Sequence, residues 1–254
     1  MNFSAFNAGE IMFFLGIIIA LLVLILHKVR RIHLATYELK RMSAESEVLF
    51  AQIQALIGLE KMLELQRPLP PLRNWAASPD FLLRLAEELL DRRPTTVMEC
   101  SSGVSTIVCA KMLQRNGFGH VFSLEHDPIY ASKTRKTLAD HGLQDWATVV
   151  DAPLTTDHTS TPWYSLDGVP TDLPPIDIVV VDGPPENTAR LARYPALPQL
   201  ASRLAVEAIV MVDDANRPDE MTMLQKWKTE FPDFQQHDGF CEKGCVIVER
   251  SLAS

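Results

Sequence analysis

The fold of this chain is decided by residues 95–106, Thr-Thr-Val-Met-Glu-Cys-Ser-Ser-Gly-Val-Ser-Thr. A short run with strand character ends at Glu99, a turn of small residues follows, and an apolar helical pattern continues through Leu113. This order predicts a strand, a tight turn and a helix. Gly103 lies where the backbone can approach a ligand closely.

Carboxylates also end four later apolar runs, at Glu125, Asp151, Asp182 and Asp213-Asp214. Helical patterns separate most of these runs, and strands that alternate with helices predict a parallel sheet with right-handed crossovers. The carboxyl ends of such strands share one edge, where ligands bind. Six carboxylates at one edge repel each other, so we expect a cationic ligand, a metal or ribose hydroxyls there.

The remaining pattern predicts a Rossmann-like, doubly wound α/β fold with a mostly parallel sheet and a C-terminal antiparallel hairpin. Helices are expected at about 79–92, 104–116, 128–141, 186–204 and 217–230. Strands are expected at about 96–100, 120–125, 146–150, 176–182 and 207–213, with the hairpin at 234–238 and 244–250. Residues 152–175 are proline-rich and predict a long loop over the ligand edge.

Residues 11–26 are apolar and uncharged, and Lys28, Arg30 and Arg31 follow them. As a helix this run spans about 24 Å, slightly less than a hydrocarbon core of about 30 Å. A cleaved signal peptide has its positive charge before the apolar run, which is the reverse of this order. We therefore predict a single-pass anchor in residues 1–29, inserted through 11–27, with the N-terminus outside and the rest cytoplasmic. The alternative is a buried helix of a soluble protein.

Residues 30–66 continue as a helical pattern with heptad spacing. In the two series that start at Ile32 and Ala35, eight of ten positions are apolar. This spacing predicts a coiled-coil stalk that forms a homo-oligomer. The alternative is a helix that lies against its own catalytic domain. Residues 67–77 are proline-rich and read as a linker to a globular domain at 78–254.

Charge and cysteine content exclude other classes. The formal net charge is −8 and no basic stripe is present, which argues against nucleic acid as a partner. The four cysteines are Cys100, Cys109, Cys241 and Cys245. The last two are spaced C-x3-C without a second pair, so reduced thiols are expected rather than zinc.

Several of these motifs together resemble the class I S-adenosylmethionine-dependent methyltransferases, in the small-domain branch with ExGSGxST and VDGPP motifs. The resemblance covers roughly residues 75–250. Its motifs are Val97–Thr106, the strand end at Glu125, Ile176–Pro185, Arg193–Leu197 and Val212–Arg217. One departure is Ser101, which stands where the family has its first glycine.

The resemblance implies S-adenosylmethionine as the methyl donor and assigns roles by position. Glu99 and the 101–103 turn would lie under the methionine part, with Ser105 and Thr106 in the same motif. Glu125 would accept hydrogen bonds from the ribose hydroxyls, and Asp151 and Ala152 would flank the adenine. Asp182 would lie beside the sulfonium and the acceptor.

Methyl transfer requires alignment of the donor and the acceptor, and a hydroxyl acceptor must also lose a proton. Two routes are open. Asp182, Asp213 and Asp214 could hold Mg²⁺, which lowers the pKa of the acceptor, or Asp214 acts as a general base without metal. Arg193 and Arg217 either neutralise an anionic acceptor or pair with the acidic edge.

The predicted function is therefore a membrane-anchored O-methyltransferase with a small or lipid-linked acceptor. A nicotinamide-binding protein is the first alternative, because Gly103 and Glu125 are 22 residues apart. The turn lacks G-x-G-x-x-G, however, since Ser101 and Thr106 replace glycines. The second alternative is a non-catalytic membrane scaffold that keeps the methyltransferase-like fold.

Overall fold

The computed structural model describes residues 7–72, 76–157 and 159–251. It divides into two compact units, up to Phe50 and from Ala51 onward. The first unit is helical throughout its described part and belongs to α1 (Ala8–Leu63), whose apolar side chains from Ile11 to Leu26 are exposed. By length and composition alone α1 is able to cross a membrane.

The second unit is built on a seven-stranded sheet with the strand order β3-β2-β1-β6-β7-β9-β8. Its strands are β1 (Thr96–Cys100), β2 (His120–Glu125), β3 (Ala147–Asp151), β6 (Ile176–Val181), β7 (Leu204–Asp213), β8 (Phe234–Asp238) and β9 (Cys245–Arg250). The pairs from β3 to β7 are parallel, and β9 is antiparallel to both of its neighbours. The predicted fold class is thereby confirmed.

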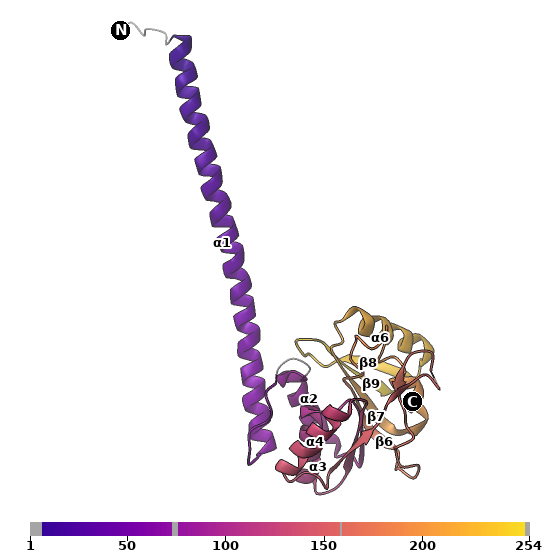
Figure 1. Ribbon diagram of the computed structural model, residues 1–254. Helices are drawn as coiled ribbons and strands as arrows, with labels where there is room; N and C mark the ends of the chain where they lie inside the picture. Colours follow the sequence, from indigo (N-terminus) through magenta and orange to yellow (C-terminus); the bar gives the residue numbers. More distant parts are fainter. Residues whose placement is uncertain (1–6, 73–75, 158, 252–254) are drawn as a thin grey trace. The chain divides into compact units, whose positions relative to one another are not determined.

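Helices cover both faces of this sheet (Figure 1). One face is covered by α2 (Pro79–Arg92), α3 (Val104–Asn116) and α4 (Pro128–Asp140). The other carries α5 (Ala196–Leu200), α6 (Pro218–Glu230) and the segment 152–175, whose Trp163 is buried with Trp227 in a second core. Two apolar cores on opposite faces hold the strand ends at fixed positions.

The C-terminal end of α1 belongs to the second unit. Leu59 and Leu63 are fully buried and share one core with Phe81 of α2. The alternative of a helix that packs on its own domain therefore holds for this end. Within the first unit the heptad positions Ile32 and Leu39 are exposed, and the oligomeric stalk stays a prediction.

The helix predicted at 186–204 is wrong over its first ten residues. Residues 186–195 form turns, and only α5 and the 3₁₀ turn η1 (Ala201–Arg203) are helical. Two local causes act together. Leu191 has a φ of 54°, and Pro195 disfavours helical geometry at the residue before it.

The long loop predicted at 152–175 contains a small hairpin of β4 (Leu154–Thr155) and β5 (Trp163–Tyr164). Its two aromatic residues are buried, and they hold the segment against the sheet. The segment is thus anchored by tertiary packing, which the proline content of the sequence did not reveal.

Candidate active site

Backbone hydrogen bonds align the carboxyl ends of four parallel strands. Ser101 N donates to Leu124 O at 3.1 Å, Asp182 N to Cys100 O at 3.3 Å, and Ala152 N to Glu125 O at 2.8 Å. The turns after β1, β2, β3 and β6 therefore meet at one edge of the sheet, as parallel pairing requires.

The turn after β1 combines a strained residue with an open surface. Ser101 has a φ of 130°, in the region that favours glycine. A Cβ added to Gly103 would meet no atom within 4 Å, so the space beside it is open. Ser102 N and Oγ donate to Glu125 Oε2 at 3.1 and 2.8 Å, which ties the turn to the next strand. The sequence placed Ser102 only within the 101–103 turn and did not predict its hydrogen bonds to Glu125.

Glu99 lies below this turn and is fully buried. Its Oε2 accepts hydrogen bonds from Ser123 Oγ and, at 2.7 Å, from Thr106 Oγ1. Its Oε1 has no hydrogen-bond partner among the described residues. Burial raises the pKa of Glu99, and the hydroxyls of Ser105, Ser123 and Thr106 oppose that shift. The site thus keeps one acidic oxygen uncompensated beneath the turn.

Glu125 is nearly buried and already accepts several hydrogen bonds. Asp127 N donates to Oε1 at 3.0 Å, in addition to the two bonds from Ser102 to Oε2. His126 Nδ1 also lies 3.2 Å from Oε1. A carboxylate has about four lone-pair sites, so at most about one remains for a ligand hydroxyl. A ribose at this position would use that site or displace the Ser102 hydroxyl.

The side chain of Asp151 points away from the turn at residues 101–103. Its side chain is 70% exposed, and its Oδ1 lies 2.7 Å from a guanidinium nitrogen of Arg135 on α4. Ala152 is buried beside the end of β2. An adenine contact from either residue stays a prediction.

The ends of β6 and β7 bring three aspartates together. Carboxylate oxygens of Asp182, Asp213 and Asp214 all lie within 4.8 Å of one another. Arg193, only 4% exposed, places its guanidinium among them. Its Nη2 lies 3.2 Å from both Asp182 Oδ1 and Asp214 Oδ2. Of the two roles that the sequence left open for Arg193, the structure supports pairing with the acidic edge.

Further bonds fix Arg193 to the backbone of both strands. Nη2 donates to Asp182 O and Nη1 to Asp213 O, each at 2.9 Å. Its Nε lies 3.6 Å from Glu220 Oε1 on α6. Arg217 adds a second cation, with Nη1 3.0 Å from Asp214 Oδ2.

Burial perturbs these acids strongly. It raises the pKa of Asp182 to about 7, against the lowering effect of Arg193 and with Asp214 and Glu99 adding to the rise. Burial also raises the pKa of Asp213 well above its ordinary value. Because the groups interact, the proton is shared by the set rather than owned by one residue.

The arrangement fits a guanidinium better than Mg²⁺. A divalent ion requires oxygens at about 2.0–2.6 Å. Nη2 of Arg193 already lies 3.2 Å from two of the three carboxylates that would supply them. Asp213 Oδ1 is also engaged, because it accepts from Asp214 N at 2.8 Å. These carboxylate oxygens therefore face Arg193 and a backbone N–H rather than a metal.

Tyr164 and Gly183 close the site on the side of segment 152–175. A Cβ at Gly183 would lie 2.5 Å from Tyr164 Oη and 2.9 Å from Cys100 O, so only glycine fits. Tyr164 Oη is buried and has no hydrogen-bond partner within the described ranges. The sequence interpretation noted Tyr164 only as part of the loop, since nothing local indicates where its hydroxyl points.

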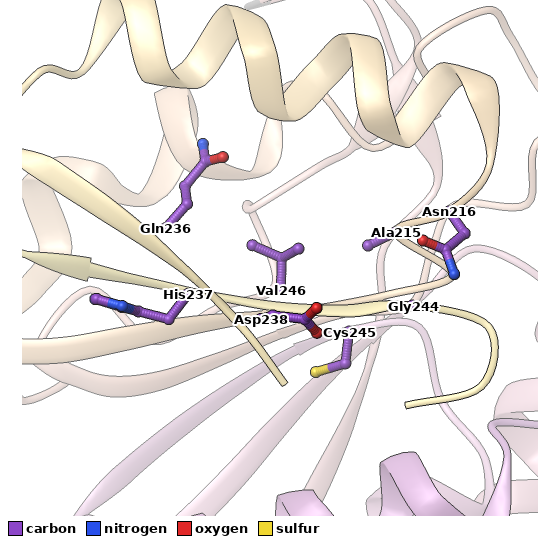
Figure 2. Close-up of a pocket in the computed structure, with 8 residues that line it drawn as sticks. All are labelled: Ala215, Asn216, Gln236, His237, Asp238, Gly244, Cys245 and Val246. Carbon is purple, nitrogen blue, oxygen red and sulfur yellow. The ribbon is translucent and has the colours of Figure 1, made fainter. Parts of the chain in front are cut away.

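Two cavities lie away from the turn. A cavity of about 170 Å³ lies between the Ala215-Asn216 turn and the β8–β9 hairpin (Figure 2). It is smaller than the roughly 300–1,000 Å³ of typical ligand pockets. Another, of about 490 Å³, lies between segment 152–175 and the α5–η1 region, with Trp163 and Arg203 in its lining. Neither is lined by Glu99, Glu125, Asp182, Asp213 or Asp214.

Comparisons with known proteins identify the fold. Residues 100–215 match the family model described as "Methyltransferase domain". The fold is a methyltransferase fold. A search of curated proteins found no match. Motif by motif, the resemblance noted in the sequence remains an interpretation.

Solved structures share the methyltransferase fold at low sequence identity. Cofactor-bound Rv0187 from MTB has a TM-score of 0.53 and 19% identity, over 82% of this chain and 91% of that one. The SAH-bound methyltransferase PaMTH1 of Podospora anserina has 0.54 and 15%, over 76% and 87%. The O-methyltransferase TomG of Streptomyces achromogenes, in complex with SAM, has 0.52 and 16%, over 80% and 90%.

Proposed function

We propose that this chain is an S-adenosylmethionine-dependent O-methyltransferase, anchored in a membrane by its N-terminal helix. The observation that carries the proposal is the meeting of Glu99, Glu125 and Asp182 at one edge of a methyltransferase fold. The family match over residues 100–215 supports it. TomG and PaMTH1, described with SAM and SAH, support the choice of donor.

The charges at the turn suit this donor, which carries a sulfonium and an ammonium group. Glu99 Oε1 is buried without a partner among the described residues, so a cation above it gains from the uncompensated charge. The open space at Gly103 admits a ligand, and Glu125 would take the ribose hydroxyls. When bound, the donor supplies a methyl group on a good leaving group.

The acceptor hydroxyl must give up a proton as its oxygen attacks the methyl carbon. We assign this proton to the Asp182 carboxylate, which keeps 12% exposure and has a pKa raised by burial to about 7. Asp214 is less suited, because two arginines contact its Oδ2. Asp214 then holds the arginines in place rather than accepting the proton.

The donor is tested by purifying the native protein and measuring co-purified metabolites by mass spectrometry, followed by calorimetry with SAM and SAH. Co-purified SAH and micromolar binding of both ligands are expected. No binding of either would refute the proposal. A panel of hydroxylated acceptors then reports turnover through SAH release.

The anchor and the acceptor are proposed from the apolar helix. We infer a single pass with the catalytic domain in the cytoplasm and an acceptor that is small or lipid-linked. Alkaline extraction of membranes should leave the protein in the pellet. Cysteine labelling should reach a residue placed before Ile11 from outside and Thr36→Cys only after lysis. Unchanged cellular product after removal of residues 1–30 would show that location does not select the acceptor.

A second candidate is a non-catalytic scaffold, which Ser101 favours because the strained turn carries a Cβ where glycine fits best. Turnover of an acceptor distinguishes the two candidates. Binding of SAM without turnover of any acceptor would support the scaffold.

A further inference from the structure

The acidic cluster of Asp182, Asp213, Asp214 and Glu220 encloses the guanidinium of Arg193. We propose that Arg193 is a built-in cation that takes the place of a divalent metal at this centre and positions Asp182. The centre would then bind no divalent ion while Arg193 is present, and the chemistry of Asp182 would be independent of metal.

Arg193 joins the same carboxylates that a bound metal ion would join. Its Nη2 lies 3.2 Å from Asp182 Oδ1 at the end of β6 and 3.2 Å from Asp214 Oδ2 after β7. Nη2 also donates to Asp182 O and Nη1 to Asp213 O, each at 2.9 Å, so the guanidinium reaches the ends of both strands. A planar guanidinium has several N–H donors in fixed directions and can contact groups on two strands at once, whereas a lysine presents only a point charge.

The charge is also comparable. Arg193 and Arg217 each carry one positive charge, and both contact Asp214 Oδ2. Together they supply the two positive charges of a divalent ion. Arg193 is buried and Arg217 is 33% exposed, so the inner position belongs to Arg193. Desolvation strengthens the attraction between Arg193 and the carboxylates around it.

The segment that carries Arg193 is held in place by contacts that do not involve Asp182, Asp213 or Asp214. Leu191 N donates to Asp219 Oδ2 at 2.8 Å, and Trp227 Nε1 donates to Tyr194 O at 2.9 Å. Both partners lie on α6. The guanidinium is therefore delivered by a fixed loop, which distinguishes it from an exposed arginine that pairs by chance.

The test measures Mn²⁺ binding by electron paramagnetic resonance, with Mn²⁺ as the probe because carboxylates bind it readily. It uses the full-length protein and the variants Arg193→Met, Arg193→Lys, Arg217→Met and Asp214→Asn. The wild type should bind no Mn²⁺ up to about 1 mM, a range in which carboxylate sites fill. Arg193→Met should bind Mn²⁺ with a Kd at least about tenfold below 1 mM. Arg217→Met, the matched control, should gain much less, because Arg217 is 33% exposed and the buried guanidinium of Arg193 stays in place.

Circular dichroism and SAM binding establish whether each variant is folded. Mn²⁺ binding by the wild type that Asp214→Asn abolishes would overturn the proposal, as would a folded Arg193→Met protein that gains no Mn²⁺ binding. If Arg193→Met does not fold, the wild-type and Asp214→Asn titrations decide.

A second readout rests on the proposed function. Removal of the cation should raise the apparent pKa of the activity profile by about one unit in Arg193→Met and leave it near the wild-type value in Arg193→Lys. A role in folding alone would not move the profile. If no methyl transfer is found at all, the proposed function fails, and the Mn²⁺ measurement still tests the role of Arg193.

Discussion

The carboxyl edge of the sheet contains two acidic regions that are neutralised in different ways. On the β1–β2 side, Glu99 and Glu125 accept hydrogen bonds from hydroxyl and backbone groups, and Glu99 Oε1 has no partner among the described residues. On the β6–β7 side, Asp182 and Asp214 contact the buried guanidinium of Arg193.

The two kinds of neutralisation suit the two regions to different chemistry. Neutral donors stabilise a carboxylate without cancelling its charge, so the β1–β2 side keeps a field that favours a cationic ligand. An internal cation offsets part of that field on the β6–β7 side, where Arg193 occupies the position that we propose a metal would otherwise take. The first region is suited to binding a donor, and the second to holding a base of near-neutral pKa.

The largest effect is expected from removing the proposed base on the β6–β7 side. Asp182→Asn should lower kcat by about 10²–10⁴-fold, because the acceptor loses its general base. The Kd for SAM, measured by calorimetry, should rise by at most about tenfold, because Glu99 and Glu125 remain and only the carboxylate beside the sulfonium loses its charge. Asp145→Asn, at an exposed position away from the edge, is the control. A kcat within a few fold of the wild type would exclude Asp182 as the base.

A smaller effect is expected from removing the charge of Glu125 on the β1–β2 side. Glu125→Gln removes the charge that would accept the ribose hydroxyls, and hydrogen bonds to charged groups contribute about 1.5–3 kcal/mol. The Kd for SAM, measured by calorimetry, should rise about 10–100-fold. The surface variant Asp140→Asn should leave it unchanged. Equal affinity in Glu125→Gln would remove Glu125 from the donor site.

The raised pKa of Asp182 predicts how activity and stability depend on pH. If Asp182 is the base, kcat/KM should rise about tenfold per pH unit below its pKa and level off above about pH 7. The raised pKa has the opposite effect on stability. The folded state holds this proton between about pH 3.8 and 7 while the unfolded state has lost it, so the contribution to stability is full below pH 3.8 and disappears as pH rises to 7.

Urea unfolding followed across this pH range measures the stability term, and initial rates measure the activity term. Asp182→Asn should flatten the activity profile and reduce the pH dependence of the stability, to which Asp213 and Glu99 still contribute. A wild-type activity profile that is flat from pH 5 to 8 would contradict the assignment, because a base of this pKa titrates within that interval.

The smallest effect concerns the strained turn. Ser101→Gly should raise the free energy of unfolding by about 1 kcal/mol. It relieves a backbone conformation that costs about 1–3 kcal/mol, and the entropy that glycine adds to the unfolded chain offsets part of this gain. This corresponds to a Tm increase of about 2–4 °C, measured by calorimetry. Ser202→Gly, at an exposed site, should give no gain. A loss of stability in Ser101→Gly would show that the serine side chain has a role of its own.

Local signals in the sequence determined the parallel sheet, the turn at Ser101–Gly103 and the positions of Glu99, Glu125 and Asp182 at strand ends. The alternation of apolar runs and helical patterns, and the chain direction of parallel strands, fix these features without knowledge of distant contacts. The predicted strands 96–100 and 120–125 match the structure residue for residue.

Only the tertiary structure decided which partner each acid has. Asp151 turns outward to Arg135 on α4, and Arg193 turns inward from a segment that the sequence predicted as helix. Leu59 and Leu63, at the end of the predicted stalk, pack into the domain core. A pattern along the chain gives the side of an element that a residue occupies. The choice between water, a ligand and an internal cation depends on elements that come together only when the chain folds.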